Sequence, residues 1–162
     1  MNKIIIIGCP GSGKSTFAKK LGQIINIPIY HLDLIWNKPD QTTITREEFD
    51  NKLSDIFKEE KWILDGNYQR TLERRIIEAD TIYLLDYSID TCISGATNRV
   101  GIKRDDMPWY EDNLNDEFKE RILNFSKKNL PEIYELLEKY KESKNIIIFK
   151  NREDADNYLN KL

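Results

Sequence analysis

Residues 8–16 read GCPGSGKST, a run of small and polar residues that can wrap around a phosphate chain. They follow the apolar run KIIII and match the motif G-x-x-x-x-G-K-[ST] at every position. In this motif the glycines let backbone N–H groups turn inward, and the start of the following helix favours an anion. We expect Lys14 to reach the β- and γ-phosphates of ATP and the Ser15 hydroxyl to take a position at Mg²⁺. The predicted nucleotide-binding residues are Gly8, Gly11, Ser12, Gly13, Lys14, Ser15 and Thr16.

A nucleotide bound with Mg²⁺ also needs a carboxylate at the end of a strand beside the phosphate loop. Two aspartates fit this requirement, Asp65 in WILDGNYQRT and Asp86 in TIYLLDYS. Both follow apolar runs, so the pattern alone does not choose between them. Either one could instead be an ordinary turn residue at a strand end.

These side chains need a sheet to position them, and the chain alternates strand and helix patterns. Short, β-branched apolar runs predict strands at residues 3–7, 27–32, 62–64, 81–85 and 145–149. Apolar residues at helical spacing predict helices after the phosphate loop, from residue 115, from Pro131, and after the N-cap candidates Thr45, Ser88 and Asn151. Such alternation favours a parallel sheet covered on both faces. The predicted fold is α/β, a three-layer sandwich with a five-stranded parallel sheet in a single domain over residues 1–162.

The composition is that of a globular protein, with 40% hydrophobic and 33% charged residues. A net charge of −3 gives little drive toward duplex nucleic acid or anionic lipid, so we expect neither partner. Cys9 and Cys92 lack metal-binding spacing, which favours reduced thiols in a cytoplasmic protein. The apolar run before Gly8 is too short for a signal peptide or a membrane span. We further expect a monomer.

The sequence resembles the adenylate-kinase-like group of P-loop kinases over nearly its whole length, in particular small proteins named DNA topology modulation proteins. WILDGNYQRT is similar to the adenylate kinase stretch L-D-G-F-P-R-T. This likeness implies a Mg²⁺-associated role for Asp65 rather than Asp86, and a contact of Arg70 with an acceptor phosphate. RVGIKR (99–104) is similar to R-x-x-x-R-R at the family's lid entrance, with Lys103 replacing one arginine. ERILNF (120–125) resembles the lid-exit helix, which implies that Arg121 faces phosphate.

The resemblance therefore implies a nucleotide-kinase-like P-loop domain with a short lid over about residues 99–115. That segment is long, polar and without periodicity, as functional lids often are. Arg99, Arg104 and Arg121 could surround the γ-phosphoryl group from a closing loop that excludes water. They could equally be solvated surface arginines.

The acceptor segment, about residues 31–61, departs from the family. Where adenylate kinases have G-D-M-L-R, this chain has LDLIW, so Asp33 keeps the acid but Trp36 replaces a phosphate-gripping arginine. Tyr68 also stands where the family has proline. The substrate-binding residues expected from these positions are Asp33, Trp36, Tyr68 and Arg70. Asp33 would orient or deprotonate an acceptor hydroxyl, whereas Trp36 could also be a core residue.

We therefore expect an ATP- and Mg²⁺-dependent phosphotransferase that moves the γ-phosphoryl group to a small hydroxyl- or phosphate-bearing acceptor, such as a nucleoside or nucleotide. The catalytic residues would be Lys14, Asp33, Arg99, Arg104 and Arg121. Two alternatives remain open. One is a regulatory ATP-binding protein linked to nucleic acid, and the other is a P-loop NTPase with no acceptor.

Overall fold

The computed structural model describes residues 1–108 and 116–162. Within these residues the chain forms one parallel sheet of five strands in the order β2-β3-β1-β4-β5. The strands are β1 (Lys3–Gly8), β2 (Ile29–His31), β3 (Trp62–Asp65), β4 (Thr81–Leu85) and β5 (Asn145–Phe149). The predicted five-stranded parallel sheet is confirmed, and the strand that carries the phosphate loop lies at its centre.

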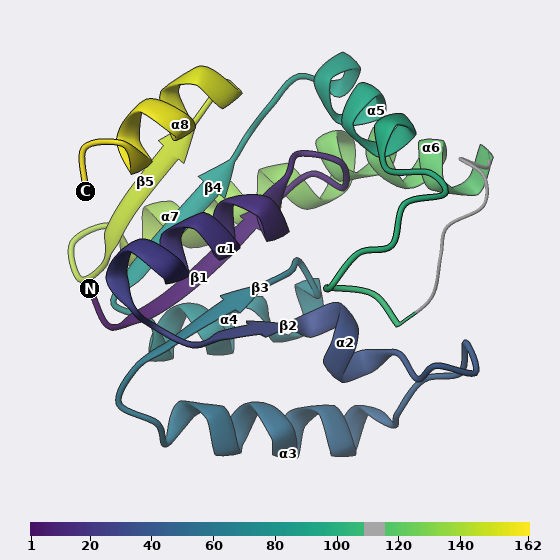
Figure 1. The fold of residues 1–162 in the computed structure, drawn as a ribbon. Coiled ribbons are helices and arrows are strands. Elements are labelled where there is room, and N and C mark those ends of the chain that lie inside the picture. The colour runs from purple at the N-terminus through teal and green to yellow at the C-terminus, as the bar shows by residue number, and fades with distance from the viewer. Residues whose placement is uncertain (109–115) are drawn as a thin grey trace.

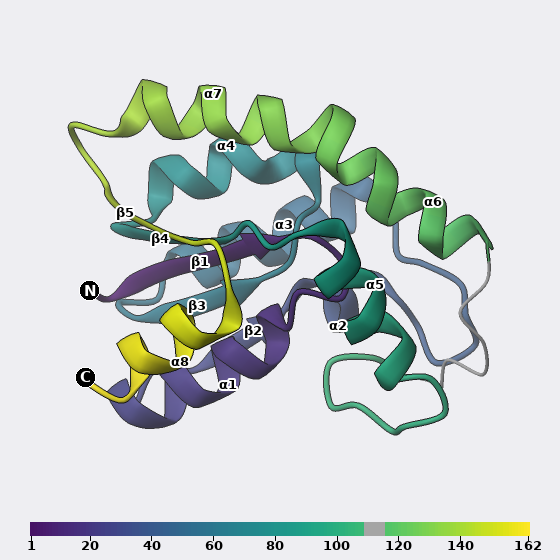
Figure 2. The same ribbon diagram turned by 90° about the horizontal axis from the view of Figure 1, so that it is seen from above.

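Helices cover both faces of the sheet, so the predicted three-layer sandwich is also confirmed. Figure 2 shows α1 (Lys14–Ile25) and α8 (Arg152–Leu159) on one side, with α4 (Gln69–Glu78) and α7 (Leu130–Tyr140) on the other. The remaining helices are α2 (Leu32–Trp36), α3 (Arg46–Phe57), α5 (Ile89–Asn98) and α6 (Asp116–Asn124), and a π-helical turn, Phe125–Asn129, joins α6 to α7. No helix among the described residues combines the length and the apolar character that a membrane crossing requires.

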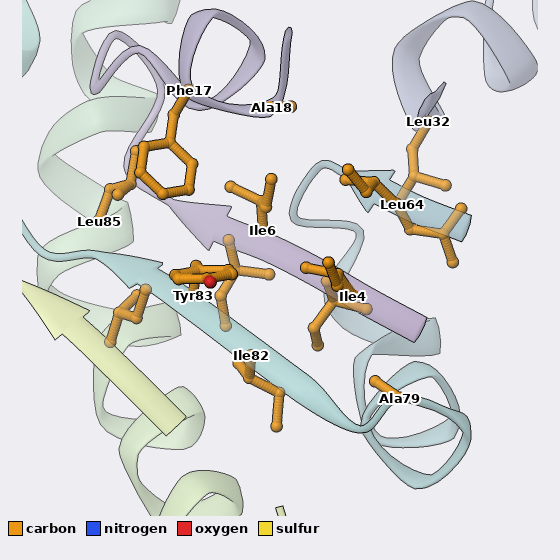
Figure 3. Packing of buried hydrophobic residues seen from close by; sticks show 14 of the residues in the cluster. Ile4, Ile6, Phe17, Ala18, Leu32, Leu64, Ala79, Ile82, Tyr83 and Leu85 are labelled. Atoms are coloured by element: carbon orange, nitrogen blue, oxygen red, sulfur yellow. The ribbon is translucent and has the colours of Figure 1, made fainter. Parts of the chain in front are cut away.

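Alternating side chains of the central strands fill two separate apolar layers. Ile6 pairs in register with Tyr83, and both point toward Phe17 of α1, whose ring centre lies 5.2 Å from that of Tyr83 (Figure 3). Ile82 points to the opposite face (Figure 3). Because β1 and β4 are buried on both faces, they read as continuous apolar runs rather than as alternating ones.

The predicted helix starts agree with the structure where a capping residue marks them. Thr45 and Glu48 form a reciprocal capping box at the start of α3, while Ser88 caps α5 and Asn151 caps α8. The short α2 and the whole of α4 were not predicted. The buried face of α4 includes Arg75 beside Leu72 and Ile76, so a charge interrupts the apolar stripe that would have revealed it.

Candidate active site

A cavity of about 1300 Å³ opens at the carboxyl ends of the strands. In Figure 1 this is the end of the sheet where α2 and α5 lie. The cavity brings together most of the predicted site residues, namely Gly11, Gly13, Lys14, Ser15, Thr16, Asp33, Trp36, Asp65, Tyr68, Arg99, Arg104 and Arg121. Gly8, Ser12 and Arg70 are not part of its lining. The predicted nucleotide and acceptor residues thus share one cavity.

The conformation of the phosphate loop depends on two glycines. Any other residue at these positions would strain the backbone. Gly11 has φ of +83°, and a Cβ atom there would lie 2.0 Å from the Cys92 carbonyl oxygen of α5. Gly13 has φ of +91° and immediately precedes α1. Both values lie in the left-handed region that side chains rarely adopt. The loop therefore leads directly into the positive end of α1, as an anion site requires.

The Lys14 side chain lies inside the cavity beside the loop that precedes it. Its Nζ atom donates a hydrogen bond to the Cys9 carbonyl oxygen at 3.1 Å. Burial lowers the pKa of Lys14, although the nearby carboxylates of Asp65 and Asp33 oppose that change. An ammonium group that is partly stripped of water in this way has a strong attraction for an incoming phosphate.

The Ser15 hydroxyl at the start of α1 meets two carboxylates. Its Oγ atom lies 2.6 Å from Asp65 Oδ2 at the end of β3, and 2.9 Å from Asp106 Oδ2 in the segment after α5. Asp65 is 4% exposed, and its Oδ1 atom is buried without a hydrogen-bond partner in the described residues. A buried carboxylate oxygen without a donor beside a serine hydroxyl suits a divalent cation such as Mg²⁺.

The two candidate carboxylates lie in different surroundings. Asp86 lies outside the cavity lining, where it pairs with Lys150 and accepts a hydrogen bond from Tyr134 at 2.6 Å. Asp65 instead contacts Ser15 and also lies 2.7 Å from Nδ1 of His31. Burial lowers the pKa of His31, but its contact with Asp65 outweighs burial, so the pKa is raised overall. The carboxylate beside the phosphate loop is therefore that of Asp65.

The acceptor side of the cavity combines one carboxylate with aromatic rings. The Tyr68 hydroxyl donates a hydrogen bond to Asp33 Oδ1 at 2.7 Å. Burial raises the pKa of Asp33 against the opposing effects of Tyr68 and Lys14. Trp36 lines the cavity and also packs edge-on against Phe49, with ring centres 5.6 Å apart. The two sequence-based readings of Trp36, as pocket wall and as packing residue, are therefore compatible.

The structure does not bring Arg70 together with the other predicted substrate residues. Arg70 is exposed and forms a two-pronged ion pair with Asp50 of α3, at 2.8 and 3.1 Å. The arginine of α4 that faces inward is Arg75, which is completely buried. Its guanidinium group donates hydrogen bonds to the carbonyl oxygens of the 66–68 loop, at 2.9 Å for Gly66 and 3.2 Å for Tyr68. Burial lowers the pKa of Arg75 to about 9.

Replacing Arg75 by methionine is expected to reduce the free energy of unfolding by about 2–4 kcal/mol, because buried carbonyl groups lose their donors. Urea denaturation measures this change. Arg74→Met is the matched control, since Arg74 is exposed and should contribute less than about 1 kcal/mol. Equal losses in the two variants would contradict the assignment of Arg75 as the support of the loop.

The three predicted catalytic arginines line the cavity. Arg99 follows α5, and Arg121 belongs to α6, and their guanidinium carbons lie 5.1 and 5.6 Å from the ring centre of Phe118. Arg104 Nε lies 3.2 Å from Asp106 Oδ1. Of the predicted lid at 99–115, residues 99–108 are described, and residues 109–115 lie outside the described residues. The described part follows directly on α5, which ends at Asn98, and the lid itself stays a prediction.

Comparison with solved structures identifies the architecture. The chain is similar to shikimate kinase from Bacteroides thetaiotaomicron (16% identity, 98% of this chain and 94% of that chain, TM-score 0.58). It is also similar to shikimate kinase from Acinetobacter baumannii in complex with shikimate (15% identity, 99% and 90%, TM-score 0.64). A gluconokinase from Sinorhizobium meliloti 1021 has 12% identity over 99% and 92% of the two chains, with a TM-score of 0.52. The chain has the P-loop NTPase fold.

No family model matches the sequence, and neither does any of the curated proteins compared with it. The resemblance to DNA topology modulation proteins therefore finds no support among these matches, whereas the three solved structures named above are two shikimate kinases and a gluconokinase. At identities of 12–16% the likeness establishes the fold and not the reaction.

Several residues of this P-loop site carry no local sequence signal. Asn67 binds both the backbone N–H and the carbonyl oxygen of Gly8, at 3.1 and 2.7 Å, and so fastens the 66–68 loop to the phosphate loop. Arg152 at the start of α8 lines the cavity and donates to the Gly11 carbonyl oxygen at 3.2 Å. Asp106 contacts Ser15 across 91 residues of sequence. Only the strand order, which brings these segments together at the carboxyl ends of the strands, could have revealed them.

Proposed function

We propose that the protein is an ATP- and Mg²⁺-dependent phosphotransferase that moves the γ-phosphoryl group to a hydroxyl group of a small acceptor. One observation carries this proposal. A single cavity joins the phosphate loop to a separate carboxylate, Asp33, which lies among aromatic side chains and hydrogen bonds to Tyr68. A hydrolase needs only the phosphate loop, whereas a kinase needs both the phosphate loop and a group that binds the acceptor.

On the nucleotide side, Lys14 and the N–H groups of the phosphate loop would bind the β- and γ-phosphates. Ser15 and Asp65 would hold Mg²⁺, since Asp65 retains a buried oxygen without a donor in the described residues. When bound, the cation neutralises charge that develops on the phosphate oxygens. Arg99, Arg104 and Arg121 face the same cavity and would stabilise the charge spread over the transferred group.

On the acceptor side, Asp33 would take the proton of the attacking hydroxyl. Its pKa is raised by burial, which brings the carboxylate closer to the basicity that proton transfer requires. Tyr68 fixes the orientation of the carboxylate through its 2.7 Å hydrogen bond. The backbone of Tyr68 has φ of +37°, an unfavourable value that the contacts of Arg75 with the loop maintain.

The aromatic wall favours an acceptor that carries a ring or another apolar surface beside its hydroxyl group. Trp36 and Tyr68 line the cavity, and their ring centres are 6.3 Å apart. Arg70, the expected partner of an acceptor phosphate, is held away by Asp50. We therefore place nucleosides and other neutral hydroxyl donors ahead of AMP. The shikimate kinases and the gluconokinase with the same fold agree with a small-molecule acceptor.

Coupled measurement of ADP release with a panel of nucleosides, nucleoside monophosphates and sugars tests the proposal. We expect AMP to be at least about 10-fold poorer in kcat/KM than the best hydroxyl donor, since Trp36 replaces one phosphate-binding arginine and Arg70 is paired with Asp50. Trp36→Arg should recover part of the AMP activity. Efficient AMP phosphorylation by the wild type, at about 10⁶ M⁻¹s⁻¹, would point to adenylate kinase instead. ADP release that no acceptor accelerates would favour an NTPase.

Replacing Tyr68 by phenylalanine is expected to shift the acidic limb of the pH profile of kcat/KM upward by about 0.5–1 unit. The Tyr68 hydrogen bond favours the charged form of Asp33, so its removal raises the pKa of Asp33 further. Because the base works deprotonated, activity then needs a higher pH. Tyr30→Phe is the control, since the Tyr30 hydroxyl contacts only Glu59, at 2.8 Å, in the described residues. An unchanged limb in Tyr68→Phe would argue against Asp33 as the base.

The link to nucleic acid stays a prediction of the sequence resemblance. The net charge of −3 gives it no electrostatic support.

A further inference from the structure

The Ser15 hydroxyl lies beside two carboxylate oxygens but can donate a hydrogen bond to only one of them. Asp65 Oδ2 lies 2.6 Å and Asp106 Oδ2 lies 2.9 Å from Ser15 Oγ. A serine hydroxyl carries one proton and can donate it to only one of these oxygens. The other contact sets a lone pair against an anionic oxygen. Both carboxylates can lie close to the hydroxyl without repulsion when a cation lies beside the Ser15 hydroxyl and the two carboxylate groups.

A second observation points to a cation at the same place. Asp65 is 4% exposed and lines the cavity, yet its Oδ1 atom has no hydrogen-bond partner among residues 1–108 and 116–162. Its Oδ2 atom is already occupied by Ser15 and His31. Leaving a buried carboxylate oxygen without a partner is costly. A metal ion would satisfy it.

We propose that Asp106 joins Ser15 and Asp65 in holding the divalent cation that accompanies the nucleotide. This inference rests on the proposed function, and it assigns a metal-binding role to a residue of the 99–108 segment. Neighbouring oxygens around Mg²⁺ lie about 2.9 Å apart, because octahedral metal–oxygen distances are about 2.0–2.1 Å. The separation between Ser15 Oγ and Asp106 Oδ2 is the same, 2.9 Å.

The cation would arrive with the nucleotide rather than before it. The described residues contain no group of three or more His, Cys, Asp or Glu side chains that could hold a metal ion by itself. Mg²⁺ in phosphoryl-transfer sites is commonly bound by one or two carboxylates together with substrate phosphates and water. Asp65 and Asp106 supply two carboxylates here, and the remaining positions belong to phosphate and water.

Asp106 also connects the cation to Arg104. Its Oδ2 atom faces Ser15, while its Oδ1 atom lies 3.2 Å from Arg104 Nε. A cation that fixes the Asp106 carboxylate therefore also fixes the Arg104 guanidinium group at the cavity. The metal would order the 99–108 segment and place a positive side chain at the phosphates in the same event.

Binding of Mn²⁺ to the complex of the protein with a non-hydrolysable ATP analogue tests the assignment, with electron paramagnetic resonance as the readout. We expect Asp106→Asn to weaken Mn²⁺ binding by about 10- to 100-fold. Asp105→Asn is the matched control, since Asp105 is exposed and pairs with Lys19, and it should bind Mn²⁺ like the wild type. Asp106→Glu keeps the charge and should fall between the two, which maintains the test if Asp106→Asn folds poorly.

Hydrogen exchange of residues 99–108 gives an independent readout. In the wild type the analogue plus Mg²⁺ should protect this segment more than the analogue alone, and Asp106→Asn should lose the difference. Wild-type Mn²⁺ affinity in Asp106→Asn would overturn the inference. The inference would also be overturned if Asp106→Asn bound the ATP analogue more tightly than the wild type, and by the same factor with and without metal. Asp106 would then merely block the phosphate position. A wild-type protein that binds neither analogue nor Mn²⁺ would overturn the proposed function itself.

Discussion

Replacing Lys14 by alanine is expected to lower the rate of ATP turnover by about 100- to 1000-fold or more, because a preorganised cation is lost where phosphate charge develops. The protein should nevertheless stay folded. Lys14 Nζ makes its hydrogen bond to the Cys9 carbonyl oxygen of the phosphate loop, at 3.1 Å. Burial lowers its pKa, which means that the fold bears a cost for keeping the ammonium charged. The positive charge of Lys14 therefore favours phosphate binding and does not stabilise the fold.

The control for this variant lies six residues further along the same helix. Lys20 is exposed and pairs with Asp156 of α8 at 2.8 Å. Lys20→Ala should keep wild-type turnover, and thermal unfolding should give similar midpoints for both variants and the wild type. Wild-type turnover in Lys14→Ala would show that GCPGSGKST does not bind the phosphates. A large drop in the unfolding midpoint would instead show that Lys14 supports the fold.

Asp33→Asn is expected to lower acceptor phosphorylation by about 100- to 10,000-fold, the usual contribution of general acid–base catalysis. Asparagine has nearly the same shape and can still contact Tyr68, but it has no carboxylate to take a proton. Binding of an ATP analogue should change little, because Asp33 lies on the acceptor side of the cavity. Acceptor-dependent ADP release and calorimetric titration with the analogue measure the two effects separately.

Asp40→Asn is a suitable control for the charge change. Asp40 lies in the same segment of the chain, but among the described residues its carboxylate accepts hydrogen bonds only from Thr42, at 2.6 and 2.9 Å. This variant should keep wild-type phosphorylation. If Asp33→Asn weakens analogue binding as much as it slows phosphorylation, Asp33 acts on the nucleotide side and the proposed role is wrong.

The features that sequence could predict are those encoded by neighbouring residues. The strand runs, the phosphate motif and the caps Thr45, Ser88 and Asn151 all depend on contacts within a few residues. Strand order is different, since it pairs β1 with β3 and β4 far along the chain. The sequence therefore predicted the five strands of the sheet, but not the order in which they pair.

The same distinction explains the candidate site. Arg70, Arg74 and Arg75 all lie within α4, and their order in the sequence does not tell which one points inward. The structure turns Arg75 into the interior and leaves Arg70 with Asp50, because the apolar residues Leu72 and Ile76 set the buried face. Asp106 and Arg152 reach the phosphate loop only through the folded sheet, so no local pattern marks them.

The central position of β1 has a consequence for how the protein is made. The phosphate motif leaves the ribosome before the strands on both sides of β1, which follow only at Trp62 and Thr81. Arg152, which binds Gly11, comes 141 residues later. Contacts of such long range form slowly compared with local ones. A nascent chain that carries the complete motif is thus not yet able to bind nucleotide.

Since a ligand stabilises only the state that binds it, we expect ATP to protect finished molecules from proteolysis and to leave incomplete ones exposed.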